Sequence, residues 1–213
     1  MNARVFTAAA ARFPLREKDI GAFSRLGGRG MTFRVKVYEA PGTGSLCLME
    51  MRAMAGLMRM ETAVFSPTGI DGPLLSMDAI AAMGQDTLLL ELYDTTLAHP
   101  DFAALGEIKT RYADLPDYDP GEHWYDAMRL DGSAYKKGRG LSGVYDPFVR
   151  DYAQRYFELL AHCPRCGEEE KKKQNAVFAD GLLQNGGPAV NQFRKMLGEE
   201  KTAEFLHKIM FCT

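Results

Sequence analysis

Cysteine is scarce in this chain, which has four in 213 residues: Cys47, Cys163, Cys166 and Cys212. They are too few and too unevenly spread for a disulfide framework, so reduced thiols are expected. No apolar run reaches the roughly 18 residues needed to cross a bilayer. The short alanine run near the start is too small and too weakly apolar for a signal peptide. These absences predict a cytoplasmic protein with no membrane span.

An excess of charge of either sign is also lacking, because the formal net charge is only -2. This balance argues against a general nucleic-acid binder. The glycine-rich stretches 27–30 and 138–140 match neither a phosphate loop nor a dinucleotide fingerprint. The four histidines show no paired ligand spacing, and no serine or cysteine nucleophile motif is found. We therefore predict no nucleotide site and no metal site.

Strand-like patterns fill the first half of the chain. Alternation at 33–39 and a Pro-Gly-Thr-Gly turn predict a hairpin with the apolar run 45–54. The full set of strand candidates is 33–39, 45–54, 57–65, 73–82 and 87–93. Short turns without helices join them, so they must form an antiparallel meander. Several are apolar on both faces, which predicts cover on both sides of the sheet.

Helical patterns dominate the second half. Asp146 and Pro147 are placed as the N-cap and first turn of a helix through 162. The expected helices are 100–112, 146–162, 168–183, 189–197 and 199–211. The segment 115–143 is expected to be long loops that line something. Together these elements predict one domain, 1–213, with an α/β fold: a three-layer α/β/α sandwich around a central antiparallel sheet.

Three carboxylates, Glu50, Glu61 and Asp78, lie inside apolar strand-like runs. A buried, unpaired carboxyl tends to keep its proton, and its raised pKa lets it donate that proton near neutral pH. If the strands pair in order, all three side chains could project to one side of the sheet. The alternative is that Glu61 pairs with Arg52 or Arg59 and that Glu50 lies near a solvated edge.

Two further patterns have an ordinary and a functional interpretation. Cys163-Pro-Arg-Cys166 has the spacing of half a zinc knuckle or a redox pair. A surface loop with free thiols is favoured, and a zinc-stabilised interaction module remains an alternative. The basic runs 136–139 and 171–173 could dock an acidic partner or form solvated faces.

The segment 57–95 resembles the ferredoxin-dependent bilin reductase superfamily, which includes red chlorophyll catabolite reductase. That family has a strand ending in Phe-Pro, a loop, then Pro-x-Phe-Gly-x-Asp and a strand ending in Asp. The corresponding pieces here are Val64-Phe-Ser-Pro, Pro73-Leu-Leu-Ser-Met-Asp and Leu92-Tyr-Asp. The segment 193–211 resembles the family's closing Phe-Gly-Glu turn and helix. The two segments cover about a third of the chain in the expected order.

The resemblance implies an α/β/α sandwich that reduces a linear tetrapyrrole lying between the sheet and the C-terminal helices. It implies no bound metal or flavin, electrons from reduced ferredoxin or flavodoxin one at a time, and a radical mechanism with protons from carboxylic acids. By position, Asp78 falls on the central proton-donating aspartate and Glu50 on a strand glutamate facing the pigment. Asn185 falls near a helix-side Asp or Asn that opposes the sheet acid.

Departures from the family pattern limit what is carried over. Glu61 stands where some members have a pigment-contacting His, and we expect it to tune or orient the site. Ser76 replaces a glycine and Cys212 the closing Asp. Arg139 and Arg194 are candidates to pair with the pigment's propionates. The alternative function is a non-catalytic tetrapyrrole or haem carrier of the same fold.

Overall fold

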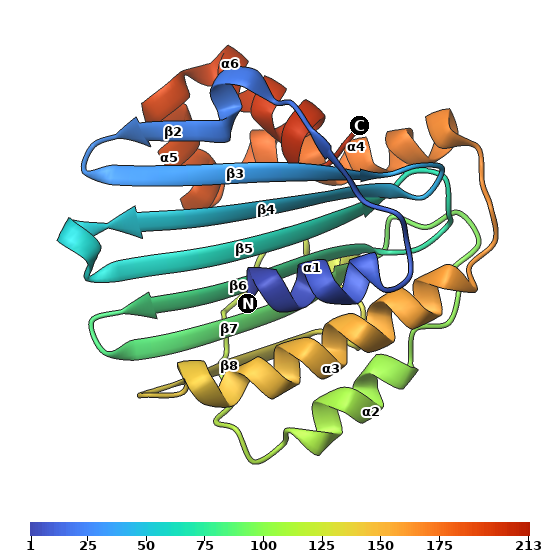
Figure 1. Cartoon of the computed structure of the whole chain (residues 1–213), viewed down its shortest axis with the longest axis horizontal. Helices are drawn as coiled ribbons and strands as arrows, with labels where there is room; N and C mark the ends of the chain where they lie inside the picture. Colours follow the sequence, from blue (N-terminus) through green and yellow to red (C-terminus); the bar gives the residue numbers. More distant parts are fainter.

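An eight-stranded antiparallel sheet runs through the centre of the computed structural model (Figure 1). The structure describes residues 1–213, apart from the side chain of Pro188. The strand order is β1-β3-β4-β5-β6-β7-β8, and β2 shares the free edge of β3 with β1. The strands are β1 (Arg16–Lys18), β2 (Arg25–Gly28), β3 (Met31–Ala40), β4 (Gly44–Ala53), β5 (Met58–Pro67), β6 (Leu74–Ala82), β7 (Gln85–Tyr93) and β8 (Ala134–Gly138). The predicted meander is therefore confirmed from β3 to β7.

Helices cover both faces of this sheet, as Figure 1 shows. On one face, called here the α3 face, lie α1 (Asn2–Ala10), α2 (Ala104–Arg111) and α3 (Ser142–Ala161). On the other, the α4 face, lie α4 (Glu168–Asn185), α5 (Pro188–Leu197), α6 (Glu199–Glu204) and the π-helical turn η4 (Phe205–Met210) that continues α6. Short 3₁₀ turns are η1 (Gly21–Ser24), η2 (Met54–Gly56) and η3 (Asp126–Met128). The predicted three-layer sandwich is confirmed.

The alternation of side chains along the strands builds two separate cores. Leu46, Phe65 and Met77 point to the α3 face and pack with Phe148 and Phe157 of α3. Their neighbours Cys47 and Val64 point to the α4 face, where the helices supply Phe178, Phe193 and Phe205. Both faces of the sheet are thus buried at its centre, as the two-sided apolar pattern predicts.

Helix α3 begins at Ser142, so the prediction that Asp146 and Pro147 start it is wrong. The cap comes from another element: the carboxylate of Asp86 in β7 accepts hydrogen bonds from the N–H groups of Leu141 (2.7 Å) and Ser142 (3.2 Å). These donors are the orphan N–H groups of a helix start. Asp146 instead forms an ion pair with Arg4 of α1 at 2.7 Å.

Four elements were missed by the sequence patterns: α1, β1, β2 and β8. Strand β8 lies within the segment expected to be loop and adds Lys136 to the buried set, where its Nζ donates to Asp117 at 2.7 Å. Helix α2 starts at Ala104 rather than at Pro100. No described helix has both the length and the hydropathy that a bilayer crossing requires.

Candidate active site

The register of the sheet separates the three carboxylates that were expected to converge. Glu50 of β4 lies directly opposite Glu61 of β5, and Glu61 lies opposite Ala79 of β6. Asp78 lies opposite Thr62 instead. Because neighbouring positions on a strand point to opposite faces, Asp78 projects to the α4 face, and Glu50 and Glu61 project to the α3 face. The prediction that all three share one side of the sheet is wrong.

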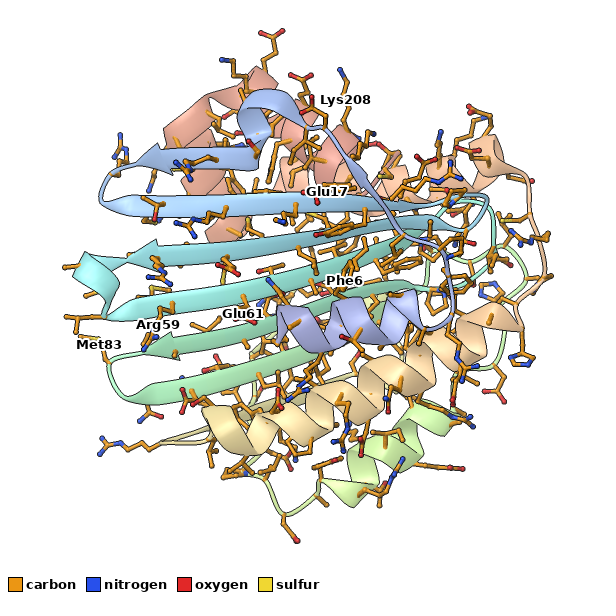
Figure 2. All side chains as sticks on the ribbon, viewed as in Figure 1. Phe6, Glu17, Arg59, Glu61, Met83 and Lys208 are labelled. Carbon is orange, nitrogen blue, oxygen red and sulfur yellow. The ribbon has the colours of Figure 1, made fainter. Side chains whose placement is uncertain are left out.

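Neither Glu50 nor Glu61 is placed to donate a proton in a site around Asp78. Glu50 is exposed. Glu61 lies beside the start of α1 (Figure 2), where its Oε2 accepts from the N–H of Asn2 at 2.7 Å and pairs with the amino group of Met1 at 2.6 Å. Burial acts to raise the pKa of Glu61, but these hydrogen bonds outweigh it and lower the pKa. Glu61 therefore stays ionised near neutral pH.

Asp78 does have the environment that the sequence predicts for it. Burial raises its pKa to about 7, against the hydrogen bond from Thr62, which lowers it, and with the charge of Glu91, which raises it further. Thr62 Oγ1 donates to Asp78 Oδ1 at 2.5 Å. A carboxyl with this pKa exists in both protonation states at neutral pH, so it can deliver and recover a proton.

A second buried acid, Glu91 of β7, lies on the same face. It pairs with Ser76, two residues from Asp78, so the two acids are diagonal neighbours on adjacent strands. Its Oε1 accepts from the hydroxyl of Tyr135 in β8 at 3.0 Å and lies 3.9 Å from Nη2 of Arg129. Burial raises the pKa of Glu91 above its ordinary value, although these partners act to lower it.

The connection from α2 to β8 covers one side of this acid pair. His123 stacks on Tyr125 with ring centroids 4.9 Å apart, and the Arg129 guanidinium lies over the rings of Tyr125 and Tyr135 at 5.5 and 5.0 Å. Five polar atoms here are buried without a hydrogen-bond partner among the described residues: His123 Nδ1, Trp124 Nε1, Asp126 Oδ1, and Nε and Nη2 of Arg129. Of these, Arg129 Nη2 and Asp126 Oδ1 form an ion pair at 2.7 Å. Buried polar atoms are nearly always paired, so such a cluster marks a place where a ligand's polar groups would be accommodated.

Trp124 fixes this connection against α4. Its ring packs on Phe178 at a centroid distance of 5.8 Å. Gly181 lies beneath the same ring, where a Cβ atom would come within 2.2 Å of the indole. Glycine is therefore required at this position by close packing rather than by backbone conformation.

The sheet around Asp78 is a partly open shelf. On the α4 face, Ser76, Asp78 and Ile80 of β6 and Thr87 and Leu89 of β7 are all half-buried. Two cavities lie elsewhere: one of about 270 Å³ between α1, α3 and the ends of β5–β7, and one of about 340 Å³ beside the C-terminus. Neither is lined by Asp78 or Glu91, so the acid pair lies outside both cavities.

The other predicted binding residues are Asn185, Arg139 and Arg194. No described contact joins any of them to Asp78. Asn185 is exposed at the end of α4, and its Nδ2 donates to the carbonyl of Gly181 at 3.0 Å. Arg139 is exposed on the turn after β8. Arg194 forms an ion pair with Glu199 at 2.8 Å and donates to the carbonyl of Leu183. Both arginines remain untested as propionate partners.

The motif Cys163-Pro-Arg-Cys166 lies on the connection between α3 and α4 with both thiols free. Burial raises the pKa of both thiols, to about 11 for Cys163, which disfavours the nucleophilic thiolate form. Among the described residues, no group of three or more His, Cys, Asp or Glu side chains is arranged to hold a metal ion. The zinc-module alternative therefore lacks the further ligands it needs.

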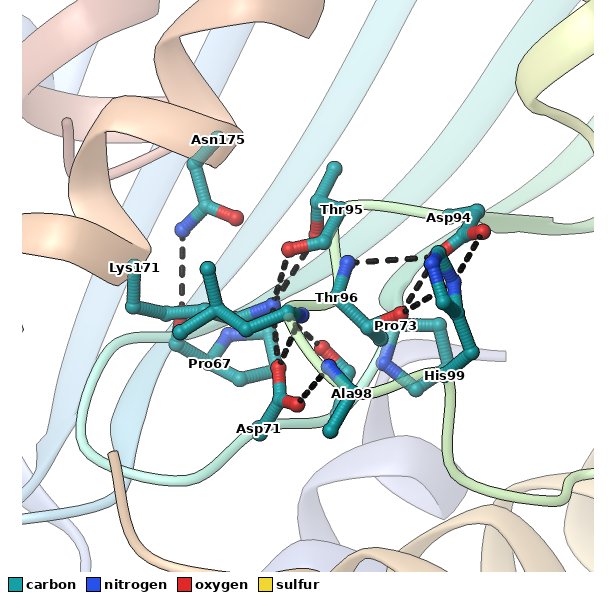
Figure 3. Close-up of polar contacts among 12 residues, drawn as sticks. Pro67, Asp71, Pro73, Asp94, Thr95, Thr96, Ala98, His99, Lys171 and Asn175 are labelled. Carbon is teal, nitrogen blue, oxygen red and sulfur yellow. Dashed lines mark hydrogen bonds and ion pairs between the residues drawn. The ribbon is translucent and has the colours of Figure 1, made fainter. Parts of the chain in front are cut away.

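The basic run 171–173 is only partly a surface feature. Lys171 is fully buried, with its Nζ donating to the carbonyls of Gly72 (2.7 Å) and Thr95 and lying 3.7 Å from Oδ1 of Asp71 (Figure 3). Asp71 in turn accepts from the N–H groups of Leu97 and Ala98, both at 2.7 Å. This network ties α4 to the loop before β6 and to the end of β7, so Lys171 has a structural role.

Thr62, Glu91, Arg129 and Tyr135 were not singled out from the sequence. Glu91 had a signal, because it is a carboxylate inside the apolar strand Leu-Leu-Leu-Glu-Leu-Tyr, the same pattern that identified Asp78. Thr62, Arg129 and Tyr135 become recognisable only through the register of β5 with β6 and the pairing of β7 with β8.

With this geometry in place, comparison with solved structures is informative. The chain superposes on phytochromobilin synthase from tomato, in complex with biliverdin, with a TM-score of 0.79, covering 97% of this chain and 81% of that chain at 12% identity. This chain has the same fold as that synthase. The predicted resemblance is thus confirmed at the level of the fold, which is what a likeness at this identity establishes. No family model and no curated protein matches the sequence.

Proposed function

We propose that this protein is a reductase of a linear tetrapyrrole that takes electrons one at a time from reduced ferredoxin or flavodoxin. The observation that carries the proposal is Asp78, whose carboxyl has a pKa of about 7 and lies on the α4 face, the side of the sheet that the C-terminal helices cover. The solved structure of phytochromobilin synthase, which has this fold, is a complex with biliverdin, and this supports a pigment of that class. Single-electron delivery makes the mechanism a radical one.

Electrons and protons balance as follows. Reduction of one double bond consumes two electrons and two protons, so two reduced ferredoxins are oxidised per turnover. The first electron makes the bound pigment more basic, and the O–H bond of protonated Asp78 breaks as the proton forms a new bond to the pigment. The hydrogen bond from Thr62 stabilises the carboxylate that remains. A second electron and a second proton complete the reaction.

We assign the second proton to Glu91, in place of the earlier candidates Glu50 and Glu61. Glu91 is 7% exposed, its pKa is raised by burial, and it is a diagonal neighbour of Asp78 on the same face. We further assign Arg129 as a partner for a pigment carboxylate: its Nη2 pairs with Asp126 at 2.7 Å, but its Nε is buried without an acceptor, and an Arg–carboxylate contact is charge-assisted. With Arg129 in this role, the proposal needs no contribution from Arg139 or Arg194.

The decisive test is Asp78→Asn. This substitution keeps the shape and the Thr62 contact but removes the titrating proton. We expect biliverdin to bind with an unchanged shift of its visible spectrum, while turnover with reduced ferredoxin falls by about 100-fold or more. Asp114→Asn is the matched control, because it makes the same chemical change at an exposed position just after α2, and we expect full activity. An active Asp78→Asn variant would remove the role of Asp78.

Glu91→Gln tests the second assignment. Its glutamine retains a carbonyl to accept from Tyr135 but cannot supply a proton. We expect a loss of about tenfold or more in the rate. A pigment radical that has gained one electron and one proton should accumulate in stopped-flow spectra, because the first step still proceeds. A slower rate without such a species would assign Glu91 to folding or pigment binding only.

A non-catalytic pigment carrier is the second candidate. The observation in its favour is that Thr62, which does not titrate, faces Asp78 across the strand pair. The same spectra separate the two functions, because a carrier shifts the absorbance of biliverdin but forms no product when reduced ferredoxin is added.

A further inference from the structure

A patch of four arginines occupies the part of the α3 face that no helix covers. Figure 1 shows that α1 and α3 lie across β4–β8 and leave bare the ends of β3, β4 and β5 that adjoin the turn η2. Arg25, Arg34, Arg52 and Arg59 are exposed there. All four point to the α3 face. Arg34 lies opposite Glu50, which is an even number of residues from the buried Leu46, and Arg25 lies opposite Arg34. Arg52 is two residues from Glu50 on the same strand, and Arg59 lies opposite Arg52. We call these four residues the arginine face.

The arginine face places like charges opposite each other in two cross-strand pairs. Arg25 lies directly opposite Arg34, and Arg52 directly opposite Arg59. Like charges directly opposite each other on neighbouring strands destabilise a sheet. None of the four guanidinium groups forms an ion pair or a side-chain hydrogen bond with a described residue. The chain as a whole is slightly acidic, with a net charge of -2, whereas this surface carries four arginines beside one carboxylate, Glu50, which lies opposite Arg34.

Large apolar side chains border the same surface. Met54 and Leu57, on the turn between β4 and β5, are 50% and 69% exposed, and Met83, on the turn between β6 and β7, is 79% exposed. Figure 2 shows Arg59 and Met83 at the same end of the sheet. Arginine and methionine are enriched in protein–protein interfaces, where an apolar contact is combined with complementary charge.

We propose that the arginine face is the docking surface for an acidic electron-carrier protein; the identity of this partner as an electron carrier rests on the proposed function. Carboxylates on the partner would separate the paired arginines and relieve their repulsion, and the apolar border would contact a small apolar area at the centre of the complex. A carrier bound here has only the sheet between it and the shelf around Asp78. The α4 face stays free, so pigment and carrier can bind together.

The composition of the surface favours a protein over other anions. Glu50 lies within the patch, opposite Arg34, and Glu17 forms an ion pair with Lys36 nearby at 3.5 Å. These carboxylates would be repelled by a uniformly negative nucleic-acid backbone or anionic bilayer, whereas a protein surface can offer them complementary groups.

The test measures binding of plant-type [2Fe–2S] ferredoxin, an acidic electron carrier, by calorimetry at low and high salt. Arg52→Glu with Arg59→Glu should weaken binding by about tenfold or more at low salt, and high salt should weaken binding to the unmodified chain. The control is Arg16→Glu with Lys173→Glu, which makes the same change in net charge at exposed positions away from the arginine face. We expect this control to bind within about twofold of the unmodified chain.

Equal binding by both double variants, equal loss in both, or no measurable binding to the unmodified chain would overturn the proposal. So would binding to phosphatidylserine-rich vesicles that depends on the arginine face while ferredoxin binding does not. The biliverdin absorbance shift of the Arg52→Glu, Arg59→Glu variant should be unchanged, which verifies its fold. A chain that docks ferredoxin here but never reduces biliverdin keeps this proposal and loses the proposed function; the reverse result does the opposite.

Discussion

Asp78 is unusual among the acids of this chain because folding favours its neutral form. Its ordinary pKa is 3.8, and burial raises it to about 7 in the folded protein. In the unfolded chain the carboxyl ionises above its ordinary pKa, whereas the folded chain keeps the proton until about pH 7. Between these values the folded state binds more protons, so stability falls as pH rises. Above the folded pKa the full cost is present and constant.

This linkage gives a prediction for the stability of Asp78→Asn. The amide cannot ionise, so the variant should escape the loss of stability that the unmodified chain undergoes between about pH 4 and pH 7. We expect its advantage to grow by on the order of 2 kcal/mol over that interval, a figure reduced for the partial exposure of the site. Urea unfolding of both chains at several pH values measures it. A difference that does not vary with pH would mean that Asp78 has an ordinary pKa.

The three strand acids show what a sequence reveals at the scale of single residues. An acid inside an apolar run is visible in the sequence, and for Asp78 this led to the correct environment. The face on which it projects depends on register, which turns and distant pairings set. Glu61 and Thr62 are adjacent on β5 and therefore point to opposite faces, and Thr62, not Glu61, lies opposite Asp78. Glu50 and Glu61 consequently project to the face away from Asp78. Glu91 shows the same signal and lies on the same face as Asp78.

At the scale of elements, the attachment of α4 depends on one buried charge. Lys171 is fully buried, and removing its ammonium group would leave Asp71, itself 2% exposed, without its cation. We expect Lys171→Met to lower the free energy of unfolding by about 3 kcal/mol, because breaking a buried pair leaves an uncompensated charge. The exposed neighbour gives the control: Lys173→Met should change stability by less than about 0.5 kcal/mol. Chemical denaturation of both variants measures the contrast, and equal effects would contradict a structural role for Lys171.

Elements with a strong local pattern were predictable, and those defined by distant partners were not. The strands from β3 to β7 and the helix α5 carry their own periodicity and were found with small errors at their ends. Strand β8 has five residues, Ala-Tyr-Lys-Lys-Gly, and exists because it completes the free edge of β7. The start of α3 was misplaced since its cap is Asp86, which lies 55 residues from Leu141 in the chain.

At the scale of the whole molecule, the sheet separates two surfaces of different chemistry. The α4 face carries the acid pair, the aromatic connection and the half-buried shelf, all suited to a flat, conjugated ligand. The α3 face carries the exposed arginines beyond the helices that cover the rest of it. Because one strand contributes to both faces through alternation, β5 presents Thr62 to one surface and Arg59 to the other. Pigment and partner are therefore expected to protect different parts of the chain.

Hydrogen exchange measured by mass spectrometry tests this division. Biliverdin on the α4 face should slow exchange in the segment 121–130 and in the last turn of α4, which flank the shelf, and leave α1 and the turn 54–57 unchanged. Ferredoxin should protect the turns 54–57 and 83–84 and leave 121–130 unchanged. Inner-strand amides are already hydrogen-bonded, so the information lies in these loops and helix ends. Protection of α1 by biliverdin would instead place the pigment in the groove of about 270 Å³ beside Glu61, on the face away from Asp78.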